Sequence, residues 1–249
     1  MTNKAILQLK DIFLKFSGES HEIEVLNGIN LDIDRGSSVA ILGPSGSGKS
    51  SLLSIVTGLE KQTSGSVTVA GHILDHMNED QLALFRRDNM GIILQSFHLI
   101  PTMTALENVA VPLELAGQKD AMATAEAALD HVGLRHRLAH YPAQLSGGEQ
   151  QRVAIARAVA PNPKIIFADE PTGNLDGKTG HKIIELIFNL QKKFNTTLIM
   201  ITHDTQVAQH CDRILYIQDG LIVDRQSQKG PSDEEDTSDQ KSTTKKVAE

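Results

Sequence analysis

The stretch Gly43-Pro44-Ser45-Gly46-Ser47-Gly48-Lys49-Ser50 decides the fold of this chain. Two of its glycines are separated by four residues, and the second is followed by Lys and Ser, which is the pattern of a phosphate-binding loop. A short apolar run, residues 38–42, precedes the loop, and a helix is expected to begin near Lys49. A strand, a glycine-rich loop and a helix in this order open an α/β unit whose sheet is mainly parallel.

Each residue type in this loop has a separate role in holding the phosphates of a nucleotide. The glycines let successive backbone N–H groups turn inward around phosphate oxygens, and the helix start adds its partial positive charge. Lys49 is placed to reach the β and γ phosphates, and the Ser50 hydroxyl is placed to bind Mg²⁺. The predicted phosphate-binding residues are Gly43, Pro44, Ser45, Gly46, Ser47, Gly48, Lys49, Ser50 and Ser51.

A pair of carboxylates follows a second apolar run. Residues 164–168 are expected to form a buried strand, and Asp169 and Glu170 come at its C-terminal end, the usual ligand edge of a parallel sheet. We expect Asp169 to assist the Mg²⁺ ion and Glu170 to polarise the water that attacks the γ phosphate. An acidic pair after a strand also occurs as a helix cap or a solvated turn, and the phosphate-binding loop is what favours the catalytic interpretation.

The remaining pattern predicts a mainly parallel core sheet and an antiparallel β subdomain at the N-terminus. Residues 5–16 and 22–34 alternate apolar and polar positions on either side of a polar turn at residues 17–20, as in two antiparallel strands. The buried strand before the acidic pair is joined to another at residues 197–202 by a helix at residues 177–194, which is the arrangement of a parallel α/β sheet.

A helical insertion interrupts this pattern. Residues 105–115, 121–132 and 148–160 have helical periodicity with no convincing strand between them. We therefore expect an inserted helical subdomain at about residues 96–160.

The end of the chain has a different composition. Residues 226–249 are rich in Ser, Thr, Lys and acidic residues and almost free of apolar ones, which is typical of disorder. The sequence thus predicts one nucleotide-binding domain at residues 1–225 and a disordered polar tail at residues 226–249.

Composition excludes several other classes of protein. The formal net charge is −7, which gives no basic field for a nucleic-acid backbone, and the one cysteine, Cys211, builds neither a disulfide scaffold nor a metal cluster. We expect no nucleic-acid partner and a reducing cytoplasmic location.

No apolar run approaches the roughly 18 to 20 residues that cross a bilayer, and no signal peptide is recognisable. We therefore expect no direct membrane insertion, so that a partner must supply any membrane span.

The segment Leu145-Ser146-Gly147-Gly148-Glu149 predicts a second anion-binding helix start, far from the first in sequence. Alone it would indicate an ordinary capped helix. In order with the phosphate-binding loop and the acidic pair, it resembles the signature motif of the ABC-type ATPases. The resemblance implies that Ser146, Gly147, Gly148 and Glu149 of one subunit bind the γ phosphate of an ATP held by the phosphate-binding loop of another.

Other residues match further motifs of this family. Gln95, after the apolar strand at residues 90–94, resembles the glutamine that senses Mg²⁺ and the attacking water. Asn174-Leu175-Asp176 resembles the loop where subunits touch, with Gly173 in place of the usual Ser or Ala, and His203 resembles the switch histidine that contacts the γ phosphate. The resemblance thus implies catalytic roles for Glu170, His203, Gln95 and Lys49, and metal-binding roles for Ser50, Gln95 and Asp169.

An aromatic platform for adenine is also expected, because stacking buries apolar area and tolerates the detail of the base. Phe16 is the candidate, at a position where the family commonly has Tyr. The alternative is a phenylalanine that only packs in the core of its strand.

The resemblance covers about residues 5–225. Within the family, residues 95–101, 105–109 and 167–176 are similar to the branch of lipoprotein-release (LolD) and MacB-type ATPases, and most similar to the YbbA type. This implies an ATPase that uses ATP and Mg²⁺ and forms a homodimer of nucleotide-binding subunits. It also implies an integral membrane permease of MacB/LolCE type, bound at the cytoplasmic face of the inner membrane, and extraction or export of a hydrophobic or lipidated substrate.

Three alternatives share some or all of these motifs. A cell-division type ABC ATPase, which regulates a periplasmic partner through a membrane subunit without transport, shares them all. A soluble ABC ATPase that acts on DNA or ribosomes is disfavoured by the acidic charge and the short helical insertion. A small-molecule kinase would not need the segment at residues 146–148.

Overall fold

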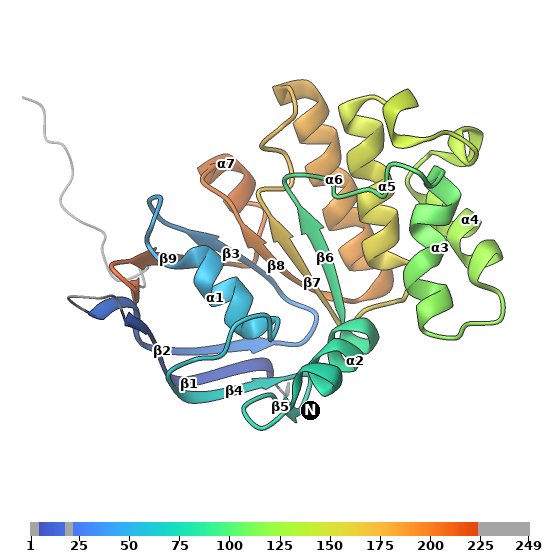
Figure 1. Cartoon of the computed structure of the whole chain (residues 1–249). Coiled ribbons are helices and arrows are strands. Elements are labelled where there is room, and N and C mark those ends of the chain that lie inside the picture. The colour runs from blue at the N-terminus through green and yellow to red at the C-terminus, as the bar shows by residue number, and fades with distance from the viewer. Residues whose placement is uncertain (1–4, 18–21, 224–249) are drawn as a thin grey trace, which may run out of the picture.

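A computed structural model describes residues 5–17 and 22–223, and the first of its two sheets is antiparallel (Figure 1). The strand order of this sheet is β2-β1-β4-β5, with β1 (Ala5–Ser17), β2 (Glu22–Asp34), β4 (Ser64–Val69) and β5 (His72–Ile73). The antiparallel pairing of β1 with β2 agrees with the alternating pattern of the sequence, whereas β4 and β5 were not expected. Of the predicted turn at residues 17–20, only Ser17 lies within the described residues.

The second sheet is mainly parallel. Its strand order is β10-β9-β3-β8-β7-β6, with β3 (Ser38–Leu42), β6 (Met90–Leu94), β7 (Ile165–Asp169), β8 (Thr197–Ile201), β9 (Arg213–Gln218) and β10 (Leu221–Val223). Pairs from β9 to β6 are parallel, and β10 pairs with β9 in the antiparallel sense. The two sheets and the helices between their strands confirm the predicted fold class.

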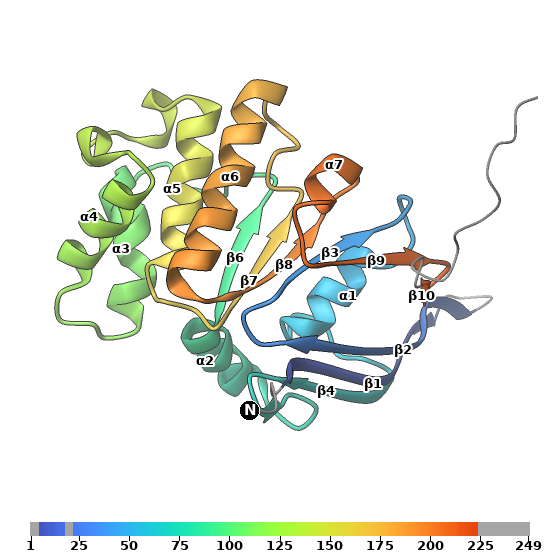
Figure 2. The same cartoon turned by 180° about the vertical axis from the view of Figure 1, so that it is seen from behind.

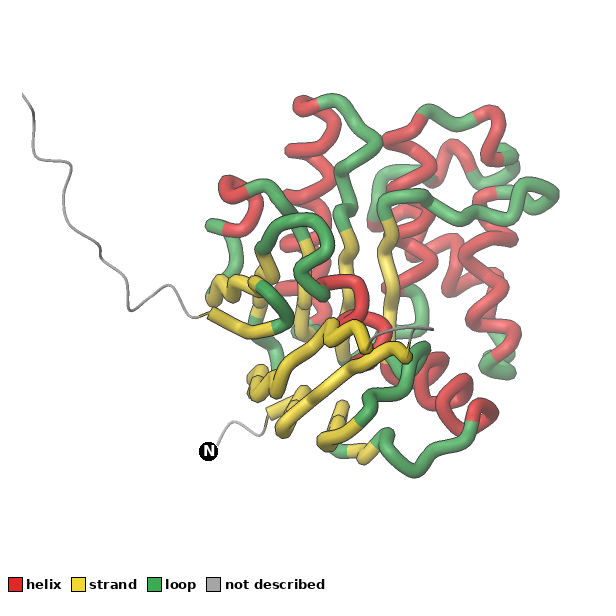
Figure 3. Tube along the Cα trace, turned by 60° about the vertical axis from the view of Figure 1, so that its left-hand side comes forward, coloured by secondary structure: helices red, strands yellow, loops and turns green. Residues whose placement is uncertain are grey.

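Helices cover both faces of the parallel sheet. They are α1 (Lys49–Val56), α2 (Glu79–Asn89), α3 (Ala105–Leu115), α4 (Ala121–His131), α5 (Gly147–Val159), α6 (Gly177–Phe194) and α7 (Thr205–Ala208), with short 3₁₀ turns at η1 (Arg135–Arg137) and η2 (Pro142–Gln144). Figures 1 and 2 show α1 between the two sheets and α3, α4 and α5 together beside β6. Figure 3 shows these three helices on the side away from the antiparallel strands.

The helices α3, α4 and α5 lie within the predicted insertion at residues 96–160. The predicted domain limits themselves stay predictions, and the tail at residues 226–249 lies outside the described residues. Within the part of the chain that the structure describes, no helix combines the length and the apolar character that a bilayer span requires.

Alternation along β7 places the acidic pair relative to the phosphate-binding loop. Ile166 and Ala168 pack in the core against α5 and α6, whereas Ile165 and Phe167 pack in the core that contains α1 and the antiparallel sheet. Successive side chains of a strand point to opposite faces, so Asp169 faces the side of α1. The end of this strand therefore directs a carboxylate toward the loop that precedes α1.

Candidate active site

The loop between β3 and α1 requires glycine where a side chain would collide with neighbouring backbone. A Cβ atom on Gly43 would lie 2.2 Å from the carbonyl oxygen of Ile217 on β9, and one on Gly48 would lie 2.9 Å from the carbonyl oxygen of Val25 on β2. Gly48 also has a φ of +102° at the N-cap of α1, a left-handed conformation that glycine adopts without strain. The two sheets therefore fix the shape of this loop from both sides.

The loop contains a cation that an anion in the cavity would attract, and a buried hydroxyl. Lys49 Nζ donates to the carbonyl oxygens of Gly43, at 2.9 Å, and Pro44, at 2.7 Å, so the ammonium group is turned back onto its own loop. Ser47 Oγ is buried and has no hydrogen-bond partner among the described residues. A phosphate group offers the ammonium group of Lys49 stronger acceptors than these carbonyl oxygens, because hydrogen bonds between charged partners are roughly twice as strong as neutral ones.

A cavity of about 490 Å³ opens over the loop. Its lining residues are Val25, Gly43, Ser45, Gly46, Gly48, Lys49, Ser50, Ser51, Gln95, Asp169, Glu170, Ile201 and His203. The fold therefore brings together all the predicted catalytic and metal-binding residues, which come from separate segments of the chain. Pro44 and Ser47 belong to the same loop without lining the cavity.

Asp169 is the last residue of β7, paired with Leu94 on one side and Ile201 on the other, and β7 ends one residue later than predicted. Burial raises the pKa of the Asp169 carboxyl above its ordinary value, and the charge of Glu170 raises it further, while Lys49 lowers it. A bound cation would therefore stabilise the ionised form of this carboxylate.

The donor atoms around Asp169 fit the predicted Mg²⁺ ion. Besides the two carboxylates, the hydroxyl of Ser50 and the amide of Gln95 line the same cavity. All of these groups offer oxygen, which is the ligand atom that Mg²⁺ prefers.

Glu170 and His203 contact each other in the lining of the cavity. Glu170 has a φ of +43°, in the left-handed region, and its N–H donates to the Ile201 carbonyl oxygen at 2.9 Å. This sharp turn at the end of β7 brings Glu170 Oε1 within 3.1 Å of His203 Nδ1. The pair also lines a second cavity of about 450 Å³, which extends along Leu175, Asp176 and the start of α6.

Phe16 does not line the cavity over the loop. It pairs with Ile23 near the end of β1, and 45% of its surface is exposed. The residue of the antiparallel sheet that does line this cavity is Val25 on β2. The role of Phe16 as an adenine platform stays a prediction.

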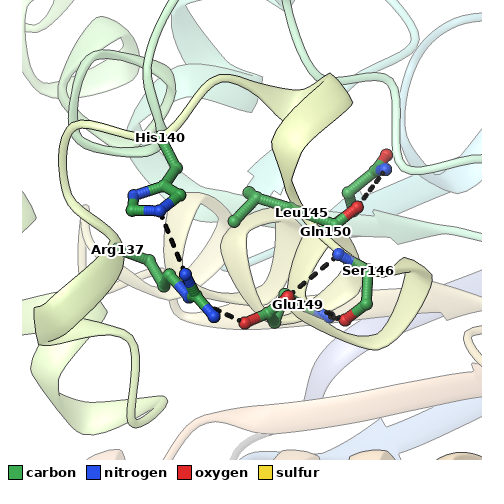
Figure 4. Close-up of polar contacts among 6 residues, drawn as sticks. All are labelled: Arg137, His140, Leu145, Ser146, Glu149 and Gln150. Carbon is green, nitrogen blue, oxygen red and sulfur yellow. Dashed lines mark hydrogen bonds and ion pairs between the residues drawn. The ribbon is translucent and has the colours of Figure 1, made fainter.

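The predicted second anion-binding helix start is the N-terminus of α5 (Figure 4). Ser146 is the N-cap, and its N–H and Oγ donate to Glu149 Oε2 at 2.9 and 2.8 Å. Arg137 Nε donates to the other carboxylate oxygen of Glu149 at 3.0 Å, and Arg137 Nη1 lies 3.0 Å from His140 Nε2. Hydrogen bonds from Ser146, together with Arg137, lower the pKa of Glu149 below its ordinary value, so the carboxylate that binds Ser146 is charged.

Gln151 joins the start of α5 to the edge of the sheet where the parallel strands end. Its side chain is fully buried, and its Nε2 donates to the carbonyl oxygens of Pro171, at 2.6 Å, and Leu94, at 3.5 Å. The start of α5 thus lies next to the ends of β6 and β7. Even so, Ser146, Gly147, Gly148 and Glu149 are absent from the lining of the cavity over the loop.

The roles of Gln151 and Arg137, which hold the start of α5, were not predicted from sequence. Gln151 shares a helical stripe with the apolar residues Ala154, Ile155 and Ala158, and a single polar residue in such a stripe is the signal that could have identified it. Arg137 gives no comparable signal, because its pairing with Glu149 depends on the turn between α4 and α5.

Known proteins are similar to this chain over most of its length. The family model described as ABC transporter matches residues 26–173. An uncharacterized ABC transporter ATP-binding protein, YbbA of Escherichia coli, is 51% identical over 204 residues, which cover 81% of this chain and 90% of that protein. The lipoprotein-releasing system ATP-binding protein LolD of Legionella pneumophila is 46% identical over 226 residues, covering 90% of this chain and all of that protein.

A solved structure shares the fold. It is a dimeric post-hydrolysis state of the ATP-binding cassette MJ0796 bound to ADP and Pi, and it superposes with a TM-score of 0.79 at 41% sequence identity. The match covers 87% of this chain and 96% of that one.

Proposed function

The chain belongs to the ABC transporter family and is an ATPase, and from this premise we propose that two copies close head to tail around two ATP molecules. Each nucleotide then lies between the phosphate-binding loop of one copy and the start of α5 of the other. The observation that carries this proposal is that Ser146, Gly147, Gly148 and Glu149 do not line the cavity that contains the predicted catalytic residues. Similarity to a dimeric cassette supports the same arrangement.

ATP binding changes the partners of the loop. Lys49 Nζ leaves the carbonyl oxygens of Gly43 and Pro44 for the β and γ phosphates. Mg²⁺ held by Ser50, Gln95 and Asp169 supplies positive charge that stabilises the ionised carboxylates and the charge on the phosphates. Phe16 is kept as the candidate platform for adenine.

Hydrolysis uses the carboxylate at the end of β7. Glu170 takes a proton from the water whose oxygen attacks the γ phosphorus, and the bond between that phosphorus and the oxygen of ADP breaks. His203 contacts Glu170 through Nδ1, so Nε2 is the atom that remains for the γ phosphate.

Loss of the γ phosphate then reopens the dimer. It removes charge-assisted hydrogen bonds to the loop of one copy and to the start of α5 of the other, so the interface weakens. The similarity to LolD, which is named as the ATP-binding protein of a lipoprotein-releasing system, supports a MacB/LolCE-type permease as the partner that this motion drives. In this proposal the chain acts at the cytoplasmic face of the inner membrane on a hydrophobic or lipidated substrate.

A groove between α2 and α3 supports contact with such a partner. This cavity of about 630 Å³ is lined by Asp80, Ala83, Leu84, Arg87, Pro112 and Leu115. Leu84 and Leu115 are 51% and 71% exposed, and apolar side chains gathered in one groove mark a protein contact. Since α2 leads directly into β6 and β6 ends beside Gln95, one short strand joins this groove to the cavity over the loop.

The proposal is tested by Ser146→Arg. We expect this variant to bind ATP as a monomer with nearly normal affinity and to lose hydrolysis, because the bulky cation blocks closure of the second copy. Thr104→Arg is the matched control, since Thr104 caps α3 through the same arrangement with Glu107. Turnover per wild-type chain should also fall on dilution, in step with the dimer fraction. Constant turnover in a strictly monomeric preparation would contradict composite sites.

A further inference from the structure

We infer that Asn174 is a positioning residue that orients the side-chain amide of Gln95, with its nitrogen toward the loop after β7 and its oxygen left for a metal ion. The inference rests on the proposed role of Gln95 as a Mg²⁺ ligand. Its basis is a reciprocal pair of hydrogen bonds between two amide side chains, together with a glycine that leaves room for them.

The first step concerns the amide of Asn174. Asn174 Nδ2 donates to the backbone carbonyl oxygen of Gln95 at 3.1 Å. A carbonyl oxygen only accepts hydrogen bonds, so the end of the Asn174 amide that faces it must be the NH₂ group. The other end, Oδ1, is thereby directed toward the side chain of Gln95.

The second step concerns the amide of Gln95. Asn174 Oδ1 also only accepts, and Gln95 Nε2 donates to it at 3.3 Å. The backbone carbonyl thus fixes the orientation of one amide, and that amide fixes the other. Since Nε2 is engaged with Asn174, the atom of Gln95 that remains for a ligand is Oε1. Mg²⁺ requires an oxygen at this position, and the reversed amide would present hydrogen atoms to it.

Gly173 leaves the space in which the Gln95 amide lies. A Cβ atom on Gly173 would lie 2.6 Å from Gln95 Nε2 and 2.9 Å from Gln95 Cδ, closer than such atoms approach. Gly173, unlike Gly43 and Gly48, does not have a φ in the left-handed region, so its backbone conformation does not explain the glycine. The position where the family usually has Ser or Ala is thus occupied here by a residue that admits the Gln95 side chain.

The backbone that follows Gln95 is held separately, by α5. Arg157 Nη1 and Nη2 donate to the carbonyl oxygens of His98 and Phe97 at 2.7 and 2.8 Å. With the backbone fixed by Arg157, the Asn174 contact controls the remaining freedom, which is the direction of the Gln95 side chain. Immobilising one such side chain in advance corresponds to about a 2- to 10-fold gain in ligand affinity.

The test measures how much Mg²⁺ increases the affinity for ATP, as the ratio of the ATP dissociation constants in EDTA and in Mg²⁺. A fluorescent ATP analogue and the full-length chain that carries Glu170→Gln and Ser146→Arg give this ratio without turnover and without closure of the dimer. We expect Asn174→Ala and Gly173→Ala each to reduce the ratio by about 2- to 10-fold, with binding in EDTA unchanged. Gly177→Ala is the matched control, because a Cβ there meets nothing within 4 Å.

A double variant separates this inference from a purely structural role and from the proposed function. In a Gln95→Ala background, Asn174→Ala should reduce the ratio no further. An additional reduction of the ratio in the double variant would overturn the inference. The inference would also be overturned if Gln95→Ala lowered the ratio while Asn174→Ala and Gly173→Ala both kept the wild-type ratio. A wild-type ratio for Gln95→Ala itself would instead overturn the proposed metal role of Gln95, and the inference with it.

Discussion

The glycines of the phosphate-binding loop should differ sharply in their contribution to stability, although all belong to one motif. Gly43→Ala places a Cβ 2.2 Å from the Ile217 carbonyl oxygen, and this obstacle is backbone near the end of β9. The loop after β3 and strand β9 must move apart by about 0.8 Å to restore a distance of 3.0 Å between the Cβ and this oxygen. Overpacking that displaces backbone costs about 3 kcal/mol of unfolding free energy.

Gly46→Ala is the matched control. A Cβ on Gly46 meets nothing within 4 Å, and only its φ of +78° opposes a side chain. Placing alanine in a left-handed conformation costs about 1 kcal/mol. The structure therefore predicts a difference of about 2 kcal/mol between two alanines three positions apart in the same loop.

Thermal unfolding without nucleotide measures this difference directly. For a chain of this size, 1 kcal/mol shifts Tm by about 2–4 °C, so Gly43→Ala should lower Tm by about 6–12 °C and Gly46→Ala by about 2–4 °C. Leaving out nucleotide separates stability of the fold from phosphate binding. Equal losses for the two variants would refute the argument that β9 limits the loop at Gly43.

Three further predictions concern the carboxylates and the groove. Glu170→Gln should keep ATP binding, accumulate an ATP-bound dimer and lower turnover by at least about 10²-fold; near-normal phosphate release would exclude a general base at this position. Asp169→Asn should raise the Tm of the nucleotide-free chain at neutral pH. The folded chain raises the pKa of the Asp169 carboxyl, so it disfavours the ionised form, and asparagine carries no such charge. That gain should shrink as the pH falls from neutral through the raised pKa of the folded chain, and it should be gone below about 4, where the unfolded chain also binds the proton; a gain independent of pH would contradict this cause. Leu115→Glu, in the α2–α3 groove, should abolish copurification with a permease while basal ATPase activity stays within about 2-fold, whereas loss of both would indicate a structural role instead.

The sequence predicts best those parts of the fold that local chemistry determines. The loop before α1 follows from its own glycines, and the caps of α3 and α5 follow from the Thr104–Glu107 and Ser146–Glu149 spacings. Apolar runs also locate β7 and β8 to within one residue at each end. In each case the decisive interactions lie within a few residues of one another.

The parts that sequence did not predict lack such a local signal. In α2 only Phe85 and Asn89 are buried, so the helix has no apolar stripe, although the Asn78–Gln81 capping box marks its start. The short strand β4 begins with the exposed residues Ser64 and Gly65. The pairing of Asn174 with Gln95 joins residues 79 positions apart, which only the parallel register of β6 and β7 brings together.

Cross-linking between two copies tests the composite site most directly. Ser45→Cys, which lines the cavity over the loop, and Ser146→Cys, at the start of α5, are combined with Glu170→Gln and Cys211→Ala. A disulfide requires Cα atoms about 4.4–6.8 Å apart, so it forms only if the two segments meet. With ATP and Mg²⁺, mild oxidation should give a covalent species of about twice 27.1 kDa, and without nucleotide it should not. A product that stays at 27.1 kDa when ATP is bound would contradict a nucleotide site shared between two copies.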